Sequence, residues 1–563
     1  MSGPVKVDVL VVGSGAAGLS AAVTAAMHGA SVMVAEKASV LGGTSAWSGG
    51  WIPRNPLARA EGIDEAADAP LTYLQHEMGG EAADIRLQTF LRYGPEMVEF
   101  FHQRTAVQFL SGSAMPDFHP SPGAANGGRS VTAQPYDGRL LGDWLHRLRP
   151  PLETISLGGM GIAGGADMAH FFNATHSPRS ALYAARRLLR HGWQRLRAGR
   201  GQHLVNGNAL VARLLRSALD AGVRFQLNAP VVRLLQGPPG VSGAVLRSDG
   251  GEIHVEAGAV VLACGGFPHD RQRLAQVVPH AAEGYGHFSA APPDNQGEGI
   301  RLGESVGGQF DTSLRHPLAW APVSRVTLAS GQQLMFPHLV ERAKPGVIAV
   351  LPNGKRFVNE ADSYHDFIAA LLAATPAGDT PQAWLLADRR ALRRYGLGHA
   401  RPFPFTPTAW LRTGYLQRGN TLAELAKQCA IDANALAETV ERFNHFASTG
   451  EDVDFHRGAS AYNRAQGDHQ VTLGPLREGP FYAVRILPGS LGTFSGLQTD
   501  EHARVLDEQQ QPIPGLYAIG NDMSSVMRGY YPSGGITLGP AMTFGYLVGK
   551  NLAKKTNINN NIT

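Results

Sequence analysis

The N-terminus constrains the fold more than any other segment, because it combines an apolar strand, a glycine-rich turn and a small-residue helix. Residues 7–12 form the strand, residues 13–18 read Gly-Ser-Gly-Ala-Ala-Gly, and residues 19–28 form the alanine-rich helix. A second apolar run, 30–35, ends at Glu36. This pattern predicts a βαβ unit whose glycines let the backbone turn, approach a pyrophosphate and pack helix against strand. The helix N-terminus then receives the phosphate charge, and the acid binds a ribose.

Segments further along the chain favour FAD over NAD as the dinucleotide. A second small-residue loop, 41–50, directly follows the predicted ribose-binding acid. Residues 259–267 and 515–521 are apolar strands that end in glycine or in a polar residue, and ligands bind at such strand ends. Residues 534–540 open a small-residue helix, predicted over 541–552, whose N-terminus would stabilise a reduced flavin anion. The predicted fold is therefore α/β, with a Rossmann-type, GR2-like FAD-binding domain built from both chain ends.

The predicted cofactor contacts come from these loops and strand ends. They are Gly13, Ser14, Gly15, Ala16, Ala17, Gly18, Glu36, Lys37, Gly42, Gly43, Thr44, Ser45, Ser48, Gly49, Gly50, Val232, Ala263, Gly265, Gly266, Gly520, Asn521, Gly535, Ile536 and Leu538.

The chain is long enough for more than the cofactor fold, since 563 residues correspond to roughly two to four domains. Residues 316–488 are richer in Arg, Pro and aromatic residues, with a predicted helix over 422–446 and an irregular run over 452–476. We therefore expect an FAD-binding domain in 1–315 and 489–563, the second part ending in a polar tail. An α+β catalytic or capping domain is expected between them.

Composition excludes several classes of function. Charged residues make up 17% of the chain, the formal net charge is +4, and no dense basic stripe occurs, so nucleic-acid binding is not expected. The two cysteines, Cys264 and Cys429, are too few for a disulfide framework or a metal site, and they fit a cytoplasmic protein. Residues 9–27 carry no charge, but they pass from a β-branched run into glycine and alanine, so no transmembrane helix is expected.

Two tyrosine-centred motifs place a phenol beside residues expected near the flavin. The first spans 353–367 and contains Tyr364. The second, 528–535, reads Arg-Gly-Tyr-Tyr-Pro-Ser-Gly-Gly and contains Tyr531. A phenol in such a place can move a proton or donate to a carbonyl oxygen. A packed tyrosine with a satisfied hydroxyl is the structural alternative for each.

With these motifs the chain resembles the 3-ketosteroid dehydrogenases of the 3-oxosteroid 1-dehydrogenase type, within the fumarate-reductase-like family of FAD-dependent oxidoreductases. The resemblance spans nearly the whole chain. The matching segments are 42–50, 135–139, 356–360, 491–497, 520–527, 531–535 and 539–546.

The resemblance implies a mechanism. Tyr364 would be the general base that removes the proton α to a ketone. Tyr531 and the backbone N–H of Gly535 would polarise the carbonyl, and flavin N5 would accept hydride from the β carbon. An α-proton is acidic enough only if preorganised donors hold the enolate oxygen. A tyrosine, with its pKa of about 10, also needs neighbouring donors or cations to act as a base at neutral pH, and His365, Arg356 and Tyr531 are the candidates.

The sequence departs from this family in one loop. In the 1-ene-forming enzymes a further tyrosine assists the base, whereas Phe118 or His119 stands at that position here. Ser533 lies inside the second tyrosine motif, two residues after Tyr531. This Tyr-x-Ser arrangement is similar to that of the branch that forms the 4-ene from 5α-saturated ketosteroids. Tyr462 would supply a further phenol from the capping domain.

The predicted function is FAD-dependent desaturation of a cyclic ketone, with 1,2-desaturation of a 3-ketosteroid as the leading form. A 3-oxo-5α-steroid 4-dehydrogenase, a smaller cyclic-ketone dehydrogenase and a fumarate- or urocanate-reductase-like flavin reductase are the enzymatic alternatives. A flavin-binding sensor or scaffold is the non-enzymatic one. Thr44 lacks the imidazole by which some relatives attach flavin covalently, so non-covalent FAD is expected.

A basic amphipathic helix is predicted over 182–200, where six arginines alternate with leucines and a tryptophan. Such a helix docks on anionic lipid, which would suit a sterol substrate and a quinone as electron acceptor. An ordinary solvated face over the core is the alternative. We therefore expect at most peripheral membrane contact.

Overall fold

The computed structural model describes residues 4–53, 56–238, 240–328 and 330–560. The chain opens with strand β1 (Val5–Val12), helix α1 (Ala16–Met27) and strand β2 (Val32–Ala35), and the two strands pair in parallel. This is the βαβ unit that the glycine pattern predicts, and the mixed α/β class is confirmed.

The βαβ unit belongs to an eight-stranded sheet that joins both ends of the chain. Its main path runs β19-β20-β11-β1-β2-β8, and β10 and β9 extend from β11. The central pairs β1–β11 and β11–β20 are parallel, so their carboxyl ends meet at one edge. The further bounds are β8 Arg224–Gln226, β9 Val231–Gly237, β10 Gly240–Ser248, β11 Gly251–Leu262, β19 Arg504–Leu506 and β20 Pro512–Ala518.

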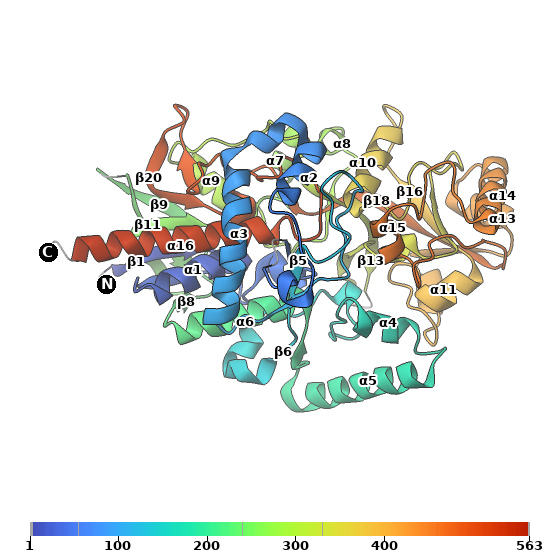
Figure 1. Cartoon of the computed structure of the whole chain (residues 1–563), viewed down its shortest axis with the longest axis horizontal. Helices are drawn as coiled ribbons and strands as arrows, with labels where there is room; N and C mark the ends of the chain where they lie inside the picture. The colour runs from blue at the N-terminus through green and yellow to red at the C-terminus, as the bar shows by residue number, and fades with distance from the viewer. Residues whose placement is uncertain (1–3, 54–55, 239, 329, 561–563) are drawn as a thin grey trace.

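Helix α16 (Leu538–Asn560) brings the C-terminal segment against α1 (Figure 1). Glycines make the contact close: a Cβ atom added to Gly545 would lie 2.6 Å from the carbonyl oxygen of Ala17, and one added to Gly549 would lie 2.7 Å from that of Ala21. The helix is longer than predicted, because no glycine or proline follows Leu552 to end it. Part of the predicted polar tail is therefore helical.

A seven-stranded sheet forms from the middle of the chain around the long strand β18 (Phe481–Thr493). The order is β14-β13-β18-β16-β15, and β12 and β17 also pair with β18. The predicted domain boundary at 488 falls inside β18, and the division into domains stays a prediction. The bounds are β12 Phe288–Ser289, β13 Leu318–Thr327, β14 Gln333–Pro337, β15 Val347–Val350, β16 Ala383–Ala387 and β17 Leu416–Gly419.

The helix predicted over 422–446 is wrong in one respect: two helices replace it, α13 (Leu422–Cys429) and α14 (Ala433–Thr449). Ala430 adopts a left-handed φ of 53°, which ends the first helix, and Asp432 caps the second by accepting a hydrogen bond from the amide of Ala435.

The remaining elements surround the two sheets (Figure 1). The other helices are α2 Ala69–Met78, α3 Ile85–Arg104, α4 Ala166–Phe172, α5 Pro178–Ala198, α6 Asn206–Asp220, α7 Arg271–Val277, α8 Pro279–Ala282, α9 Glu298–Glu304, α10 Tyr364–Ala374, α11 Arg389–Tyr395, α12 Thr408–Arg412 and α15 Ala461–Gln466. Short strands pair in two small sheets, β3 Trp51–Pro53, β4 Phe109–Ser111 and β5 Ser130–Ala133, and β6 Tyr136–Asp137 with β7 His203–Leu204. Within the described ranges, no helix combines the length and apolarity needed to cross a membrane.

Candidate active site

A cavity of about 1610 Å³ connects the glycine-rich loop after β1 with the two tyrosine motifs. It lies at the carboxyl ends of β1, β2, β11 and β20, where ligands bind in sheets of this kind. One wall is made of backbone and small residues, and the opposite wall of aromatic and apolar side chains.

The glycine-rich loop fits a dinucleotide phosphate. Gly13 has a φ of +107°, and a Cβ atom on it would lie 2.2 Å from the carbonyl oxygen of Ala263. A Cβ atom on Gly18 would lie 2.1 Å from the carbonyl oxygen of Gly13, so that only glycine permits this turn. The N-cap residue of helix α1, Gly15, offers no side-chain cap, and its first turn holds no acid; the amide of Ala16 donates to the hydroxyl of Ser45 at 3.0 Å. A helix N-terminus without an acid suits an anion.

Glu36, at the end of β2, faces the same loop. One of its carboxylate oxygens accepts hydrogen bonds from the amide of Ser14 at 3.1 Å and from its hydroxyl at 2.6 Å. The next residue, Lys37, pairs with Glu298. The loop and the acid therefore lie together at one end of the cavity, an arrangement that suits the pyrophosphate and the ribose of an adenosine.

Most of the predicted cofactor residues line the cavity. They are Gly13, Ser14, Gly15, Ala16, Ala17, Glu36, Lys37, Gly43, Thr44, Ser45, Ser48, Gly49, Gly50, Ala263, Gly265, Gly520, Asn521, Gly535 and Leu538.

Five predicted cofactor residues lie behind this lining: Gly18, Gly42, Val232, Gly266 and Ile536. Val231 lines the cavity in place of Val232, because neighbouring residues of a strand face opposite sides. Gly42 supports the loop, since its amide donates to the hydroxyl of Ser14 at 3.0 Å.

Asp522 is a buried residue beside the cavity that the sequence analysis did not single out. Its carboxylate accepts hydrogen bonds from the amides of Cys264 at 2.6 Å and Gly266 at 3.0 Å. Burial raises its pKa to about 6, although these amide donors oppose the shift. Asp522 therefore ties the loop after β20 to the turn after β11. The sequence signal that could have identified Asp522 is its position directly after two predicted cofactor residues, Gly520 and Asn521.

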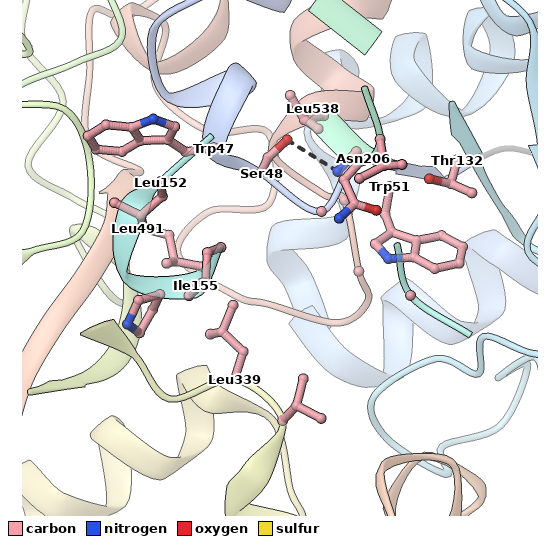
Figure 2. Close-up of a pocket in the computed structure, with 18 of the residues that line it drawn as sticks. Trp47, Ser48, Trp51, Thr132, Leu152, Ile155, Asn206, Leu339, Leu491 and Leu538 are labelled. Atoms are coloured by element: carbon pink, nitrogen blue, oxygen red, sulfur yellow. Dashed lines mark hydrogen bonds between the residues drawn. The ribbon is translucent and has the colours of Figure 1, made fainter. Parts of the chain in front are cut away.

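The middle of the cavity is shaped by Trp51 and Gly535. A Cβ atom on Gly535 would lie 2.2 Å from the carbonyl oxygen of Trp51, and the φ of Gly535 is +87°. Trp51, Thr132 and Asn206 lie together here, beside a hydrogen bond in which the amide of Gly50 donates to the hydroxyl of Ser48 at 3.2 Å (Figure 2). The sequence analysis missed Trp51, although it directly follows the predicted loop 41–50.

Four aromatic side chains from distant segments meet at the other wall. Tyr364 begins α10, Tyr462 belongs to α15, and Phe118 and Tyr531 lie on loops. The ring of Phe118 is 4.5 Å from that of Tyr462 and 5.7 Å from those of Tyr364 and Tyr531, measured between centroids. Tyr364 and Tyr531 are 5.1 Å apart and nearly perpendicular. We call these four residues the aromatic cluster.

Hydrogen bonds fix the loops that carry the aromatic cluster. The amide of Phe118 donates to the carbonyl of Pro532 at 3.0 Å, and the hydroxyl of Tyr73 donates to the same oxygen at 2.6 Å. Ser533 lies behind the lining, where its side chain bonds to the buried Asp117. Phe118 and the 531–535 segment are therefore held together as one unit. Within that segment, Ser533 does not line the cavity and supports the site from behind the lining.

The two tyrosines of the motifs are linked and kept neutral. Burial raises the pKa of Tyr364 well above its usual value, and the neighbouring Tyr531 and Tyr462 add to this effect. Burial also raises the pKa of Tyr531 to about 12, although hydrogen bonds with Tyr364 and Thr537 oppose the shift. At neutral pH both hydroxyls therefore carry their protons.

Two of the predicted tuning residues do not act as cations on the cluster. Arg356 bonds to Glu360 at 2.7 Å and Asp452 at 2.8 Å. Burial lowers the pKa of His365 to about 3, so its ring is neutral and accepts a hydrogen bond from the amide of Trp320 at 3.2 Å.

A different cation acts on the tyrosines. Arg342 is fully buried, and its charge lowers the pKa of both Tyr364 and Tyr462 against the larger effect of burial. Its guanidinium donates to the backbone carbonyls of His338 at 2.6 Å and Glu360 at 2.8 Å. No sequence motif marked Arg342, because its link to the tyrosines exists only in the folded chain.

Of the two candidates for the missing tyrosine, Phe118 packs in the aromatic cluster and His119 does not. His119 lies between two carboxylates, with Glu77 at 2.5 Å and Asp366 at 2.7 Å. Burial would lower its pKa, but these hydrogen bonds and charges outweigh burial and raise it to about 10. His119 is therefore an ion-paired cation beside the cluster.

Beyond the aromatic cluster the cavity continues as an apolar chamber toward α4 and α5. Leu152, Ile155, Leu339 and Leu491 project into one part of it (Figure 2). Other lining side chains are Met115, Met168, Phe171, Phe172 and Phe403. Among the described residues, no cluster of His, Cys, Asp or Glu is arranged to hold a metal ion.

Comparison with known proteins gives consistent matches over nearly the whole chain. A family profile described as an FAD binding domain matches residues 8–538. The chain is 39% identical to a 4-oxocyclohex-2-ene-1-carboxylate 5-dehydrogenase of Sinomonas cyclohexanicum, covering 97% of this chain and 94% of the relative. It is 36% identical to a 3-oxosteroid 1-dehydrogenase of Mycolicibacterium smegmatis, covering 97% of each.

Among solved structures, the chain matches the 3-ketosteroid Δ1-dehydrogenase of Sterolibacterium denitrificans in complex with 1,4-androstadiene-3,17-dione. The TM-score is 0.88 and the identity 36%, and the match covers 98% of this chain and all of the other. These matches confirm the resemblance inferred from the tyrosine motifs.

Proposed function

The chain belongs to the FAD binding domain family, among FAD-dependent dehydrogenases that desaturate cyclic ketones, and from this premise we propose that it introduces the 1,2 double bond of a 3-ketosteroid. The observation that carries the proposal is the aromatic cluster at the end of an apolar chamber. Tyr364 and Tyr531 meet there, on the cavity that also contains the dinucleotide loop.

FAD fits the opposite wall, because the glycine turn, the acid-free N-terminus of α1 and Glu36 suit its pyrophosphate and ribose. When bound, FAD supplies the acceptor for the hydride that leaves the β carbon.

The chain's own residues divide the remaining work. Tyr531 and the amide of Gly535 donate hydrogen bonds to the ketone oxygen, so negative charge on that oxygen is stabilised. Tyr364, as phenolate, removes the α-proton. Since burial raises the pKa of Tyr364, the phenolate is scarce at neutral pH, and turnover should increase with the phenolate fraction. Arg342 favours the phenolate through its charge.

The chamber favours a large apolar ketone. Its lining changes from the tyrosines to leucine, methionine and phenylalanine side chains that extend as far as α4 and α5. Burying the apolar rings of a steroid there would release about 25 cal/mol for each Å² of surface removed from water. A fumarate-like substrate would instead need free cations at both of its carboxylates.

A smaller ketone that carries a carboxylate is a second candidate. The observation that favours it is Lys344, a buried cation that lines the chamber. Its ammonium donates to the carbonyls of Gln466 and Gly467 at 2.7 Å each, and burial lowers its pKa to about 8. Within the described residues these two carbonyls are its hydrogen-bond acceptors, so one of its three N–H groups is open to a carboxylate.

Anaerobic mixing with a panel of ketones tests these alternatives, because flavin absorbance at about 450 nm is lost on reduction and no side chain absorbs there. Bleaching by 4-androstene-3,17-dione supports the proposal. Bleaching only by a 5α-androstan-3-one indicates 4,5-desaturation, and bleaching only by 4-oxocyclohexanecarboxylate indicates the smaller substrate. If no ketone bleaches the flavin but fumarate reoxidises the dithionite-reduced protein, the ketone proposal is wrong.

We also propose that FAD is held without a covalent bond. Thr44 lines the cavity, and its hydroxyl accepts a hydrogen bond from the side chain of Asn295 at 2.9 Å. A threonine hydroxyl forms no stable link to the flavin ring, so acid precipitation should leave the yellow colour in the supernatant. A yellow pellet would contradict this proposal.

A further inference from the structure

Helix α5 exposes an apolar stripe to solvent. Leu182, Leu189, Trp193 and Leu196 are 72%, 76%, 56% and 84% exposed. Their spacing of seven, four and three residues places all four on one face of the helix. Figure 1 shows α5 along the lower edge of the molecule, below α4. Exposed apolar faces of this kind are typical of surfaces that bind a partner or a membrane.

The exposed stripe belongs to a helix that is anchored by its other face. Arg187 bonds to Asp167 at 2.8 Å, and the hydroxyl of Tyr183 donates to the same carboxylate at 2.8 Å. One turn on, the side chains of His191 and Arg195 reach the carbonyl of Gly158 at 3.0 and 2.9 Å. The orientation of α5 is therefore fixed, and the stripe stays directed outward.

Arginines border the stripe on one side. Arg179, Arg186 and Arg190 are exposed and form no salt bridge with any residue in the described part of the chain. Arg197 lies over the ring of Trp193 at 4.2 Å. The sequence contains no Asp or Glu between Asp167 and Asp220. The helix thus combines an apolar stripe with an excess of exposed positive charge, which matches the interface of an anionic bilayer.

The inner side of α5 reaches the cavity of the active site. Leu188 and Ala184 line that cavity, as do Met168 and Phe172 of α4. Leu188 itself is 43% exposed, so it lies between the outward stripe and the chamber. A bilayer under α5 would therefore lie beside the apolar end of the chamber.

We propose that α4 and α5 dock the protein on an anionic lipid surface, and that an apolar substrate enters the chamber from the lipid. A second copy of the chain fits the stripe less well, because pairing two α5 helices would bring together two arginine-rich faces with no acid to compensate them. The docking itself does not depend on which ketone is oxidised.

Flotation of the purified FAD-bound protein with vesicles tests the docking without any turnover. We expect binding to phosphatidylcholine vesicles that contain phosphatidylglycerol, little binding to pure phosphatidylcholine, and a loss of binding at high salt. The variant Leu189→Glu/Trp193→Glu should bind at least about tenfold more weakly, because it places two charges in the stripe. Failure of the wild-type protein to bind anionic vesicles at low salt would overturn the proposal.

Two controls locate the effect. Ile85→Glu adds a charge at a residue that is 54% exposed on α3, and it should bind vesicles like the wild-type protein. Arg186→Gln/Arg190→Gln keeps the stripe but removes two charges, and it should lose the preference for anionic vesicles. Unchanged binding of the Leu189→Glu/Trp193→Glu variant would place the lipid contact elsewhere. A dimer that this variant dissociates, with no vesicle binding by the wild-type protein, would assign the stripe to a second copy.

Discussion

The dinucleotide wall and the tyrosine wall of the cavity use different parts of the chain. At the first wall, backbone amides and small residues from short contiguous loops form the surface, and glycines such as Gly13 approach neighbouring backbone closely. At the second wall, four aromatic side chains come from segments centred on residues 118, 364, 462 and 531. The first wall depends on backbone conformation, whereas the second depends on how distant segments pack.

This difference predicts how each wall responds to mutation. An added methyl group should damage the dinucleotide wall severely, because backbone atoms cannot move aside. Removing a single hydroxyl from the tyrosine wall should leave the fold intact and change only the chemistry. Both responses can be measured separately, the first as flavin content and the second as turnover per bound flavin.

The largest effect is expected from Gly13→Ala. Its Cβ atom would lie 2.2 Å from the carbonyl oxygen of Ala263, and the φ of +107° disfavours alanine. We expect a loss of about 3 kcal/mol or more in unfolding free energy and little bound FAD. Thermal unfolding and the flavin-to-protein ratio measure this. Gly80→Ala is the matched control, since no atom lies within 4 Å of its added Cβ. Equal behaviour of the two variants would refute the backbone account.

The next largest effect is expected at the tyrosine wall. Tyr364→Phe and Tyr531→Phe should each lower kcat by a factor on the order of 10² or more, while FAD stays bound. Steady-state kinetics with the bleaching ketone measure this. Tyr285→Phe, whose hydroxyl donates to Gly378, should retain wild-type turnover. Wild-type rates in both active-site variants would show that the cluster does not carry the reaction.

The pH dependence of turnover gives a smaller, graded effect. Since the pKa of Tyr364 is raised, its phenolate fraction should grow about tenfold for each pH unit below that pKa. We expect kcat/KM to rise with pH between about 7 and 9. Phe118→Tyr adds a hydroxyl near Tyr364 that can stabilise the phenolate, so the rising limb should shift by about one unit to lower pH. A profile that is flat over this range would contradict Tyr364 as the base.

The smallest effect concerns His119, which lies beside the tyrosine wall without lining it. Its folded-state pKa is raised to about 10 from 6.5, so protonation favours the folded state. The stabilisation is complete below about pH 6.5, declines as the pH rises, and is absent above about pH 10. His119→Gln should therefore cost about 2 kcal/mol at pH 6 to 7, with little change in kcat. Urea unfolding at several pH values measures it, and a cost that persists at pH 10.5 would contradict the ion-pair account.

Local sequence was enough to predict the dinucleotide wall, because turn conformation and strand ends are properties of neighbouring residues. The spacing from Gly13 to Gly18, with Glu36 after the next strand, already indicated the βαβ unit. Local sequence says less about which side chains of a strand face the cavity. Val232 stays a predicted cofactor contact, while the side chain that lines the cavity here is that of Val231.

The sequence by itself determined the α/β class, the glycine-rich loop and the two tyrosine motifs, since each of these follows from residues close together in the chain. Only the tertiary structure decided which side chains act together. It placed Phe118 in the cluster and His119 in an ion-paired position beside it, and it assigned the buried charge near Tyr364 to Arg342 rather than to Arg356. The physical reason is that electrostatic and packing interactions depend on distance in space, and residues more than a hundred positions apart become neighbours only when the two sheets fold around one cavity.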